Sequence, residues 1–157
     1  MLRDTRIPQR FAICYHPNVN AATHRMSAEI SSYLENKGLP PVYSVPIYEP
    51  GLQKRIDQGD IDLLIALGGD GTMLRAGQIC AQQRLPILGI NMGRFGFLTE
   101  VKDEQWQQAI QKILAGDYRI EARMMLRVEH WRGESLLASW DALNELVVTR
   151  GYDVRPI

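Results

Sequence analysis

The stretch LLIALGGDGT (residues 63–72) decides how this chain folds. A short apolar run, typical of a buried strand, changes abruptly into three glycines around one aspartate, Asp70. A helical pattern follows directly, so the stretch predicts a strand, a tight turn and a helix start. Glycine lets the backbone approach a ligand, and the amides of such a turn suit a phosphate. A carboxylate in this cradle needs a task, and Asp70 can accept a proton from an attacking hydroxyl or hold a metal ion.

Strands and helices alternate on both sides of this turn, which predicts an α/β fold with a Rossmann-like parallel sheet and covering helices. Gly38 and Gly116 provide stop signals for the first and last helices, and Asp103 provides a cap for the last one. We therefore expect a first domain over residues 8–117. The expected strands are residues 11–15, 42–45, 61–67 and 86–90, and the expected helices are 21–37, 52–58, 72–83 and 103–114.

The composition changes after residue 117. Residues 118–131 and 136–150 are long β-prone runs joined by the turn signal RGES, and no helical pattern follows. Two such strands would leave open edges and an uncovered face. Residues 118–157 therefore predict the first strands of a β-rich second domain that is cut off or completed by another chain. A two-stranded extension packed on the first sheet is the alternative.

Length, charge and cysteine count exclude several classes of protein. A chain of 157 residues can bury one sizeable core, and its zero net charge argues against nucleic acid as a partner. Cys14 and Cys80 are too few for a disulfide framework, and the scattered histidines predict no metal cluster. No apolar run is long enough to span a membrane, and the first ten residues do not resemble a signal peptide. We expect a cytoplasmic protein without a membrane partner.

Two further clusters accompany the glycine turn. Residues 89–100, GINMGRFGFLTE, also follow an expected strand, so the two glycine-rich loops are expected to form two walls of one crevice. Phe95 or Phe97 either stacks on an aromatic base or plugs the core beneath the loop. Asn144 and Glu145 interrupt an apolar strand, and they either bind a sugar diol or form a solvated pair at a bulge.

The glycine turn itself matches neither common phosphate motif. It is not a P-loop, because no Gly-Lys-Ser/Thr follows, and it lacks the third glycine of a dinucleotide fingerprint. Asp70 or Thr72 could simply cap the helix. Arg75 lies one turn further into the helix, near enough to reach a bound phosphate.

Taken together, these motifs resemble the NAD kinase family. Lipid kinases and phosphofructokinases carry similar first turns, whereas the three motifs in this order are specific, and the likeness extends from Phe11 onward. The matching elements are Gly68-Gly69-Asp70-Gly71-Thr72, Gly89-Ile90-Asn91-x-Gly93-x-x-Gly96-Phe97-Leu98-Thr99-Glu100, and Ala142-Leu143-Asn144-Glu145.

The resemblance implies transfer of the γ-phosphoryl group of ATP, or of polyphosphate, to the 2′-hydroxyl of the adenosine ribose of NAD, which gives NADP. It implies Asp70 as the catalytic residue, a divalent cation (usually Mg²⁺) that accompanies the phosphates, and a cytoplasmic homodimer or homotetramer. The implied NAD contacts are Asp70, Gly71, Arg75, Phe97 at the adenine, Asn144 and Glu145 at the ribose, and Arg155; the implied phosphate or ATP contacts are Gly68, Gly69, Gly71 and Thr72.

The resemblance also implies that part of the site lies elsewhere. Members of the family continue into a β-rich domain with a Gly-Ser-Thr-Ala-Tyr type motif that completes the NAD and ATP sites. The chain therefore resembles the first domain and the opening strands of the second, and we expect it to be inactive alone.

Two other functions stay open at this point. A lipid kinase of the diacylglycerol type shares the first turn but usually continues into a Gly-Thr-x-Asn-Asp loop, where this chain has NMGRFG (residues 91–96). A non-catalytic nucleotide-binding domain, completed by another chain, fits the unfinished β-region.

Overall fold

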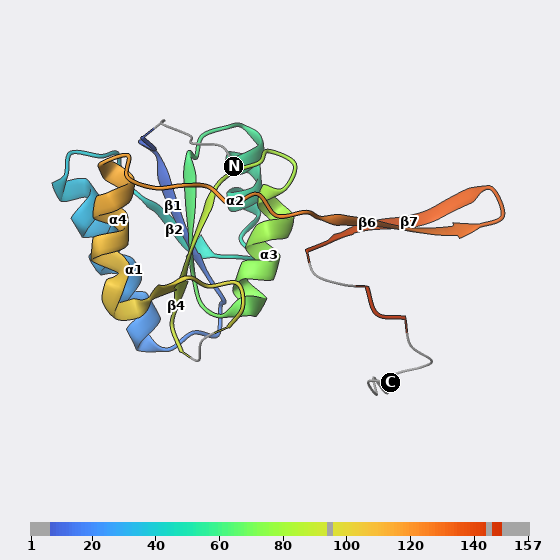
Figure 1. Cartoon of the computed structure of the whole chain (residues 1–157), viewed down its shortest axis with the longest axis horizontal. Coiled ribbons are helices and arrows are strands. Elements are labelled where there is room, and N and C mark those ends of the chain that lie inside the picture. Colours follow the sequence, from blue (N-terminus) through green and yellow to red (C-terminus); the bar gives the residue numbers. More distant parts are fainter. Residues whose placement is uncertain (1–6, 94–95, 144–145, 149–157) are drawn as a thin grey trace. The chain divides into compact units, whose positions relative to one another are not determined.

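The computed structural model describes residues 7–93, 96–143 and 146–148. The chain divides into two compact units, one up to Ala122 and one from Arg123 onward. In the first unit the described residues form a five-stranded sheet flanked by helices, and in the second they form an antiparallel hairpin (Figure 1).

The five strands of the first unit are all parallel and lie in the order β2-β1-β3-β4-β5. β2 lies on one side of β1, and β3 and the later strands lie on the other side. The strand order therefore reverses between β1 and β3. Open α/β sheets bind ligands at such a point, outside the carboxyl ends of the strands. The strands are β1 (Phe11–Tyr15), β2 (Tyr43–Pro46), β3 (Leu63–Leu67), β4 (Ile87–Asn91) and the unpredicted β5 (Val101–Lys102).

Two helices cover each face of this sheet (Figure 1). Ile13 and Ile65 pack with α1 and α4 on one face, whereas Ala12 and Leu64 pack with α2 and α3 on the other. The central strands β1 and β3 are apolar along their length and buried on both faces, which is typical of a parallel sheet. The predicted α/β fold is confirmed. The helices are α1 (Ala21–Asn36), α2 (Pro50–Asp57), α3 (Asp70–Cys80) and α4 (Trp106–Leu114).

The predicted helix stops are also confirmed. Gly38 and Gly116 follow α1 and α4 with φ of +82° and +72°, a conformation that glycine adopts without strain. The predicted cap at Asp103 is wrong. Its carboxylate accepts the N–H of Glu104 at 2.9 Å inside a 3₁₀ turn, Asp103–Gln105, and α4 starts only at Trp106.

The second unit is a two-stranded hairpin with two chemically different faces. β6 (Leu126–Arg132) pairs with β7 (Ser135–Ala142). On one face Val128 stands opposite Trp140, and on the other Arg127 binds Asp141 with Nε–Oδ1 at 3.0 Å. The first strand is shorter than residues 118–131 predict, because Tyr118 packs against the core of the first unit instead.

Candidate active site

Asp70 stands where β3 passes into α3, at the carboxyl edge of the sheet. Gly69 is the N-cap residue of α3, and no side chain caps this helix. The half-buried Asp70 carboxylate reaches the second glycine-rich loop instead: Oδ2 accepts the N–H of Phe97 and Oδ1 that of Leu98, both at 3.0 Å. The alternative that Asp70 only caps its helix is therefore wrong. The two loops also meet through the N–H of Gly68, which donates to the carbonyl of Ile90 at 3.0 Å.

The glycines of the first turn serve different purposes. A Cβ at Gly68 would lie 2.9 Å from the Cβ of Thr72 and still closer to its hydroxyl, so the half-buried Thr72 side chain requires glycine there. A Cβ at Gly69 or Gly71 would meet nothing within 4 Å among the described residues. Packing against the described chain therefore does not explain these two glycines, and the space above them is open to a ligand.

Phe97 is the most exposed large apolar side chain of the described residues, with 95% of its surface accessible. Its neighbours Leu98 and Thr99 are buried beneath the loop. The alternative that Phe97 plugs the core is therefore wrong, and Leu98 takes that place. Because the N–H of Phe97 is held by Asp70, the exposed ring has a fixed attachment point beside the carboxylate. Phe95, the other aromatic considered, lies outside the described residues.

Arg75 lies on the exposed side of α3, and its guanidinium faces the ring of Tyr48 at 5.7 Å from the ring centroid. Its Nη1 also donates to Oε1 of Gln78 at 3.3 Å. Tyr48 follows β2 and meets the ring of His16, which follows β1, edge-on at 5.9 Å. Side chains from two strand ends and α3 therefore gather beside the glycine turn, and Arg75 is the cation among them.

Three predicted site residues cannot be placed. Asn144, Glu145 and Arg155 lie outside the described residues. The described part of the third motif ends with Ala142 and Leu143, at the end of β7. The assignment of Asn144 and Glu145 to the ribose, and of Arg155 to the nucleotide, therefore stays a prediction.

A metal ion would find few ligands here. No three His, Cys, Asp or Glu side chains among the described residues are grouped to hold one. Magnesium that arrives on phosphate oxygens needs only one or two carboxylates. Each Asp70 oxygen has one backbone N–H partner and lone pairs left over. The donor set therefore fits a cation carried in by a phosphorylated ligand.

None of the helices in the described part of the chain is both long and apolar enough to cross a membrane.

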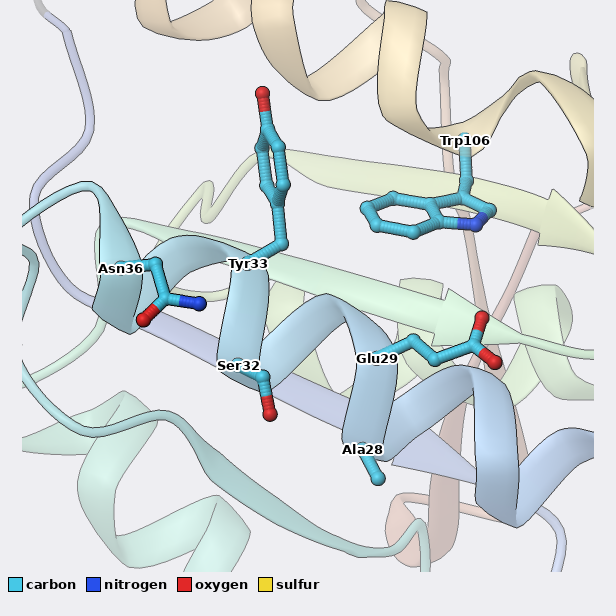
Figure 2. Close-up of a pocket in the computed structure, with 6 residues that line it drawn as sticks. All are labelled: Ala28, Glu29, Ser32, Tyr33, Asn36 and Trp106. Atoms are coloured by element: carbon cyan, nitrogen blue, oxygen red, sulfur yellow. The ribbon is translucent and has the colours of Figure 1, made fainter.

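One surface hollow lies away from these residues. A pocket of about 430 Å³ lies between α1 and α4, where the rings of Tyr33 and Trp106 meet edge-on with their centroids 5.5 Å apart. Figure 2 shows the residues that line it. α1 and α4 cover the opposite sheet face from α3, and no candidate site residue lines this pocket. It is a gap between two helices and not the candidate active site. Its lining residues are Ala28, Glu29, Ser32, Tyr33, Asn36 and Trp106.

The sequence did not reveal which residues contact Asp70 and Arg75. Gly96 and Leu98 belong to the second motif, but nothing in the local pattern shows that they meet Asp70. Tyr48 and His16 were missed as neighbours of Arg75 for the same reason. A signal exists only in the topology: all of these segments follow strands whose carboxyl ends share one edge.

Comparison with known proteins adds a family to this geometry. Residues 18–118 match the family model described as the ATP-NAD kinase N-terminal domain. The chain is 45% identical over 108 residues to an NAD kinase of Heliobacterium modesticaldum, which covers 69% of this chain and 38% of that protein. It is 32% identical over 146 residues to an NAD kinase of Chloroflexus aurantiacus, which covers 90% of this chain and 50% of that protein.

The fold is also shared with a solved structure. The crystal structure of yeast NADH kinase complexed with NADH superposes with a TM-score of 0.64 at 16% identity, covering 87% of this chain and 47% of that one. At this identity the likeness shows the fold alone. The chain spans half or less of the length of the curated relatives described above.

Proposed function

The chain belongs to the ATP-NAD kinase family, and from this premise we propose that it supplies the NAD-facing half of an NAD kinase site. The reaction transfers the γ-phosphoryl group of ATP, or a phosphoryl group of polyphosphate, to the 2′-hydroxyl of the adenosine ribose of NAD. The products from ATP are NADP and ADP.

One observation carries this proposal. The Asp70 carboxylate accepts the N–H of Phe97 at 3.0 Å, and the ring of that residue is 95% exposed. A proton acceptor and an aromatic platform are thus held next to each other at the carboxyl edge of the sheet. An adenosine stacked on Phe97 has its ribose adjacent to its base, so its 2′-hydroxyl is suited to meet Asp70.

The chemistry requires little more from the protein than position and charge. Asp70 accepts the proton of the 2′-hydroxyl while the ribose oxygen bonds to the γ-phosphorus, and the bond from this phosphorus to the bridging oxygen of ADP breaks. The carboxyl then releases its proton to solvent. A divalent cation, usually Mg²⁺, would arrive on the phosphate oxygens and would neutralise their charge.

The remaining candidate residues take supporting roles in this proposal. The turn formed by Gly68, Gly69, Gly71 and Thr72 binds phosphate in the open space above Gly69 and Gly71, and Gly71 also lines the dinucleotide site. Arg75 contacts the nucleotide from α3, and Phe97 packs against the adenine. Asn144 and Glu145 bind the ribose hydroxyls, and Arg155 makes a further nucleotide contact.

We also propose the setting of the complete protein. Following its family, it is a cytoplasmic homodimer or homotetramer that binds ATP and NAD and completes its site with a β-rich domain. The chain alone then lacks groups that the reaction needs, so it should show no NAD kinase activity by itself.

The test compares the 157-residue chain with a joined enzyme, in which the chain is followed by the part of the Chloroflexus aurantiacus NAD kinase that lies beyond the matched region. NADP formation is measured with ATP and with polyphosphate, and diacylglycerol is offered as a competing acceptor. We expect NADP from the joined enzyme only. A joined enzyme that makes no NADP, or that phosphorylates diacylglycerol instead, would overturn the proposal.

The role of Asp70 is tested in the same joined enzyme. Asp70→Asn should lower the turnover number by roughly 10²–10⁴, the usual loss when a general base is removed. Asp62→Asn is the matched control, because Asp62 lies before β3 at the opposite end of the strands and should leave turnover unchanged. Turnover of Asp70→Asn equal to that of the control would contradict a catalytic role.

A further inference from the structure

The Asp70 carboxylate joins two segments that are far apart in the sequence. Its partners, the N–H groups of Phe97 and Leu98, lie 27 and 28 residues away along the chain. One oxygen serves each N–H, both at 3.0 Å, so the carboxylate holds the loop with both of its oxygens. Charged acceptors make stronger hydrogen bonds than neutral ones, so this is a firm attachment for the loop that presents the Phe97 ring.

Gly96 is the residue that makes this attachment possible. A Cβ built at Gly96 would overlap Oδ1, Cγ and Oδ2 of Asp70, so no side chain can stand there while the carboxylate stays in place. Gly96 is not among the glycines with positive φ, so its backbone conformation does not demand glycine. What demands glycine is the space that the Asp70 carboxylate occupies.

We infer that Gly96 is a positioning residue, whose missing side chain admits the Asp70 carboxylate and thereby couples the proton acceptor to the aromatic platform for adenine. The structural part of this inference stands on the described contacts alone. Its catalytic consequence rests on the proposed function: a side chain at position 96 should disturb both the chemical step and NAD binding, while ATP binding is spared.

The same geometry changes what Asp70→Asn means. An asparagine offers one acceptor oxygen in place of two, and its NH₂ group would face a backbone N–H that is also a donor. One of the two loop amides must therefore lose its partner. We expect this variant to bind NAD more weakly in addition to turning over more slowly, so its defect is not purely that of a missing base.

The first experiment measures amide hydrogen exchange in the 157-residue chain at low concentration, by mass spectrometry of peptides that end on either side of Phe97 and Leu98. In Gly96→Ala both amides should exchange on the order of tenfold faster, because both lose a charged acceptor. Gly93→Ala is the matched control in the same loop, since a Cβ there meets nothing within 4 Å among the described residues. It should leave both amides unchanged.

The second experiment asks whether Gly96 acts through Asp70. In Asp70→Ala the carboxylate is gone and a Cβ at position 96 has room, so adding Gly96→Ala should change exchange at Phe97 and Leu98 by less than about twofold. An equal acceleration by Gly96→Ala with and without the Asp70 carboxylate would overturn the inference. So would exchange in Gly96→Ala that matches that of Gly93→Ala. If Gly96→Ala fails to fold alone, the double variant with Asp70→Ala decides, because the inference requires that removing the carboxylate lets alanine at position 96 fold.

The catalytic consequence is measured separately in the joined enzyme. Gly96→Ala should lower the turnover number and raise KM for NAD, with KM for ATP within about twofold of the original. If the exchange results hold but neither form makes NADP, the proposed function fails and the positioning role stands. If the enzyme works but exchange does not respond, the positioning role fails alone.

Discussion

The guanidinium of Arg75 stacks toward the ring of Tyr48, 5.7 Å from its centroid, and this contact links α3 to the segment after β2. Tyr48 is exposed, so the pair lies in water at the surface beside the glycine turn. Such exposed contacts add little to stability. The contact restricts the positions of the Arg75 guanidinium, and it holds this group on the side of α3 that faces the ends of β1 and β2.

The first prediction follows from this pair. Arg75→Gln should weaken NAD binding in the joined enzyme by about tenfold or more, because a charged hydrogen bond to a phosphate is lost. Tyr48→Leu should weaken it only severalfold, since the cation remains and merely loses its ring. Calorimetry measures both, and the melting temperatures should stay close to that of the unchanged protein. Equal affinities for Arg75→Gln and the unchanged protein would remove Arg75 from the site.

The second prediction concerns Asn144 and Glu145. If they bind a ribose diol, replacing either with alanine should weaken NAD binding more than ATP binding, because the diol loses a hydrogen-bond partner. Calorimetry with each nucleotide on the joined enzyme is the measurement, and Ser139→Ala in β7 is a nearby control. Unchanged NAD affinity in both variants would favour the solvated pair at a bulge.

The third prediction is a pH dependence of stability at the other end of the sheet. The Arg10 guanidinium lies 2.6 Å from the Asp62 carboxylate, which also accepts the N–H groups of Gln9 and Arg10. The Arg10 side chain is the main cause of a lowered pKa for Asp62 in the folded protein. A lowered carboxyl pKa stabilises the fold above the pKa of the unfolded chain, and this contribution is lost as the pH falls through the folded value.

We therefore expect Asp62→Asn to melt a few degrees below the unchanged protein at neutral pH. The difference should begin to shrink as the pH falls below about 4 and should vanish only below the lowered pKa of folded Asp62, where the carboxyl group is protonated in both states. Asp60→Asn is the control, because Asp60 acts on Arg10 only through its charge. A melting difference that stays constant from neutral to acid pH would contradict the assignment.

The fourth prediction concerns the hairpin. Its apolar face carries Val128 opposite Trp140, and Trp140 is 54% exposed. Exposed apolar patches of this kind mark interfaces or aggregation sites. The chain alone should therefore self-associate at high micromolar concentration in sedimentation experiments, and Trp140→Lys should shift it toward the monomer. Ser139→Lys, on the opposite face beside Glu129, should leave the association unchanged. A monomeric 157-residue chain that makes NADP at normal rates would contradict both this and its expected inactivity.

The parts of the fold that were predictable rest on local chemistry. Gly38 and Gly116 mark helix ends because a left-handed residue there favours glycine, and that preference is visible in the sequence. The start of α3 at Asp70 and not at Thr72 was not predictable, because its N-cap is Gly69 and no side chain signals it. β5 has only two residues, too few for any alternating pattern.

The candidate site divides in the same way. That the two glycine-rich loops lie together follows from the order of the strands, since β3 and β4 are neighbours. That Asp70 reaches the amides of Phe97 and Leu98 depends on side-chain geometry between distant segments, which no local pattern contains. The exposure of Phe97 was likewise open, because an aromatic residue in a glycine-rich loop suits a core position and a stacking platform equally well.

The attachment of Phe97 to Asp70 has a consequence for how this protein can change in length. β4 fixes the chain at Asn91 and the carboxylate fixes it at Phe97, so the number of residues between these two positions matters. One inserted or deleted residue would bring the wrong amides to the carboxylate and rotate a different side chain to the surface. Natural insertions and engineered tags should therefore be tolerated at the tip of the hairpin, around Gly133, and rejected between Asn91 and Phe97. To transfer this arrangement to another protein, residues 68–98 should be moved together, because Asp70 and the amides that it binds lie at opposite ends of this segment.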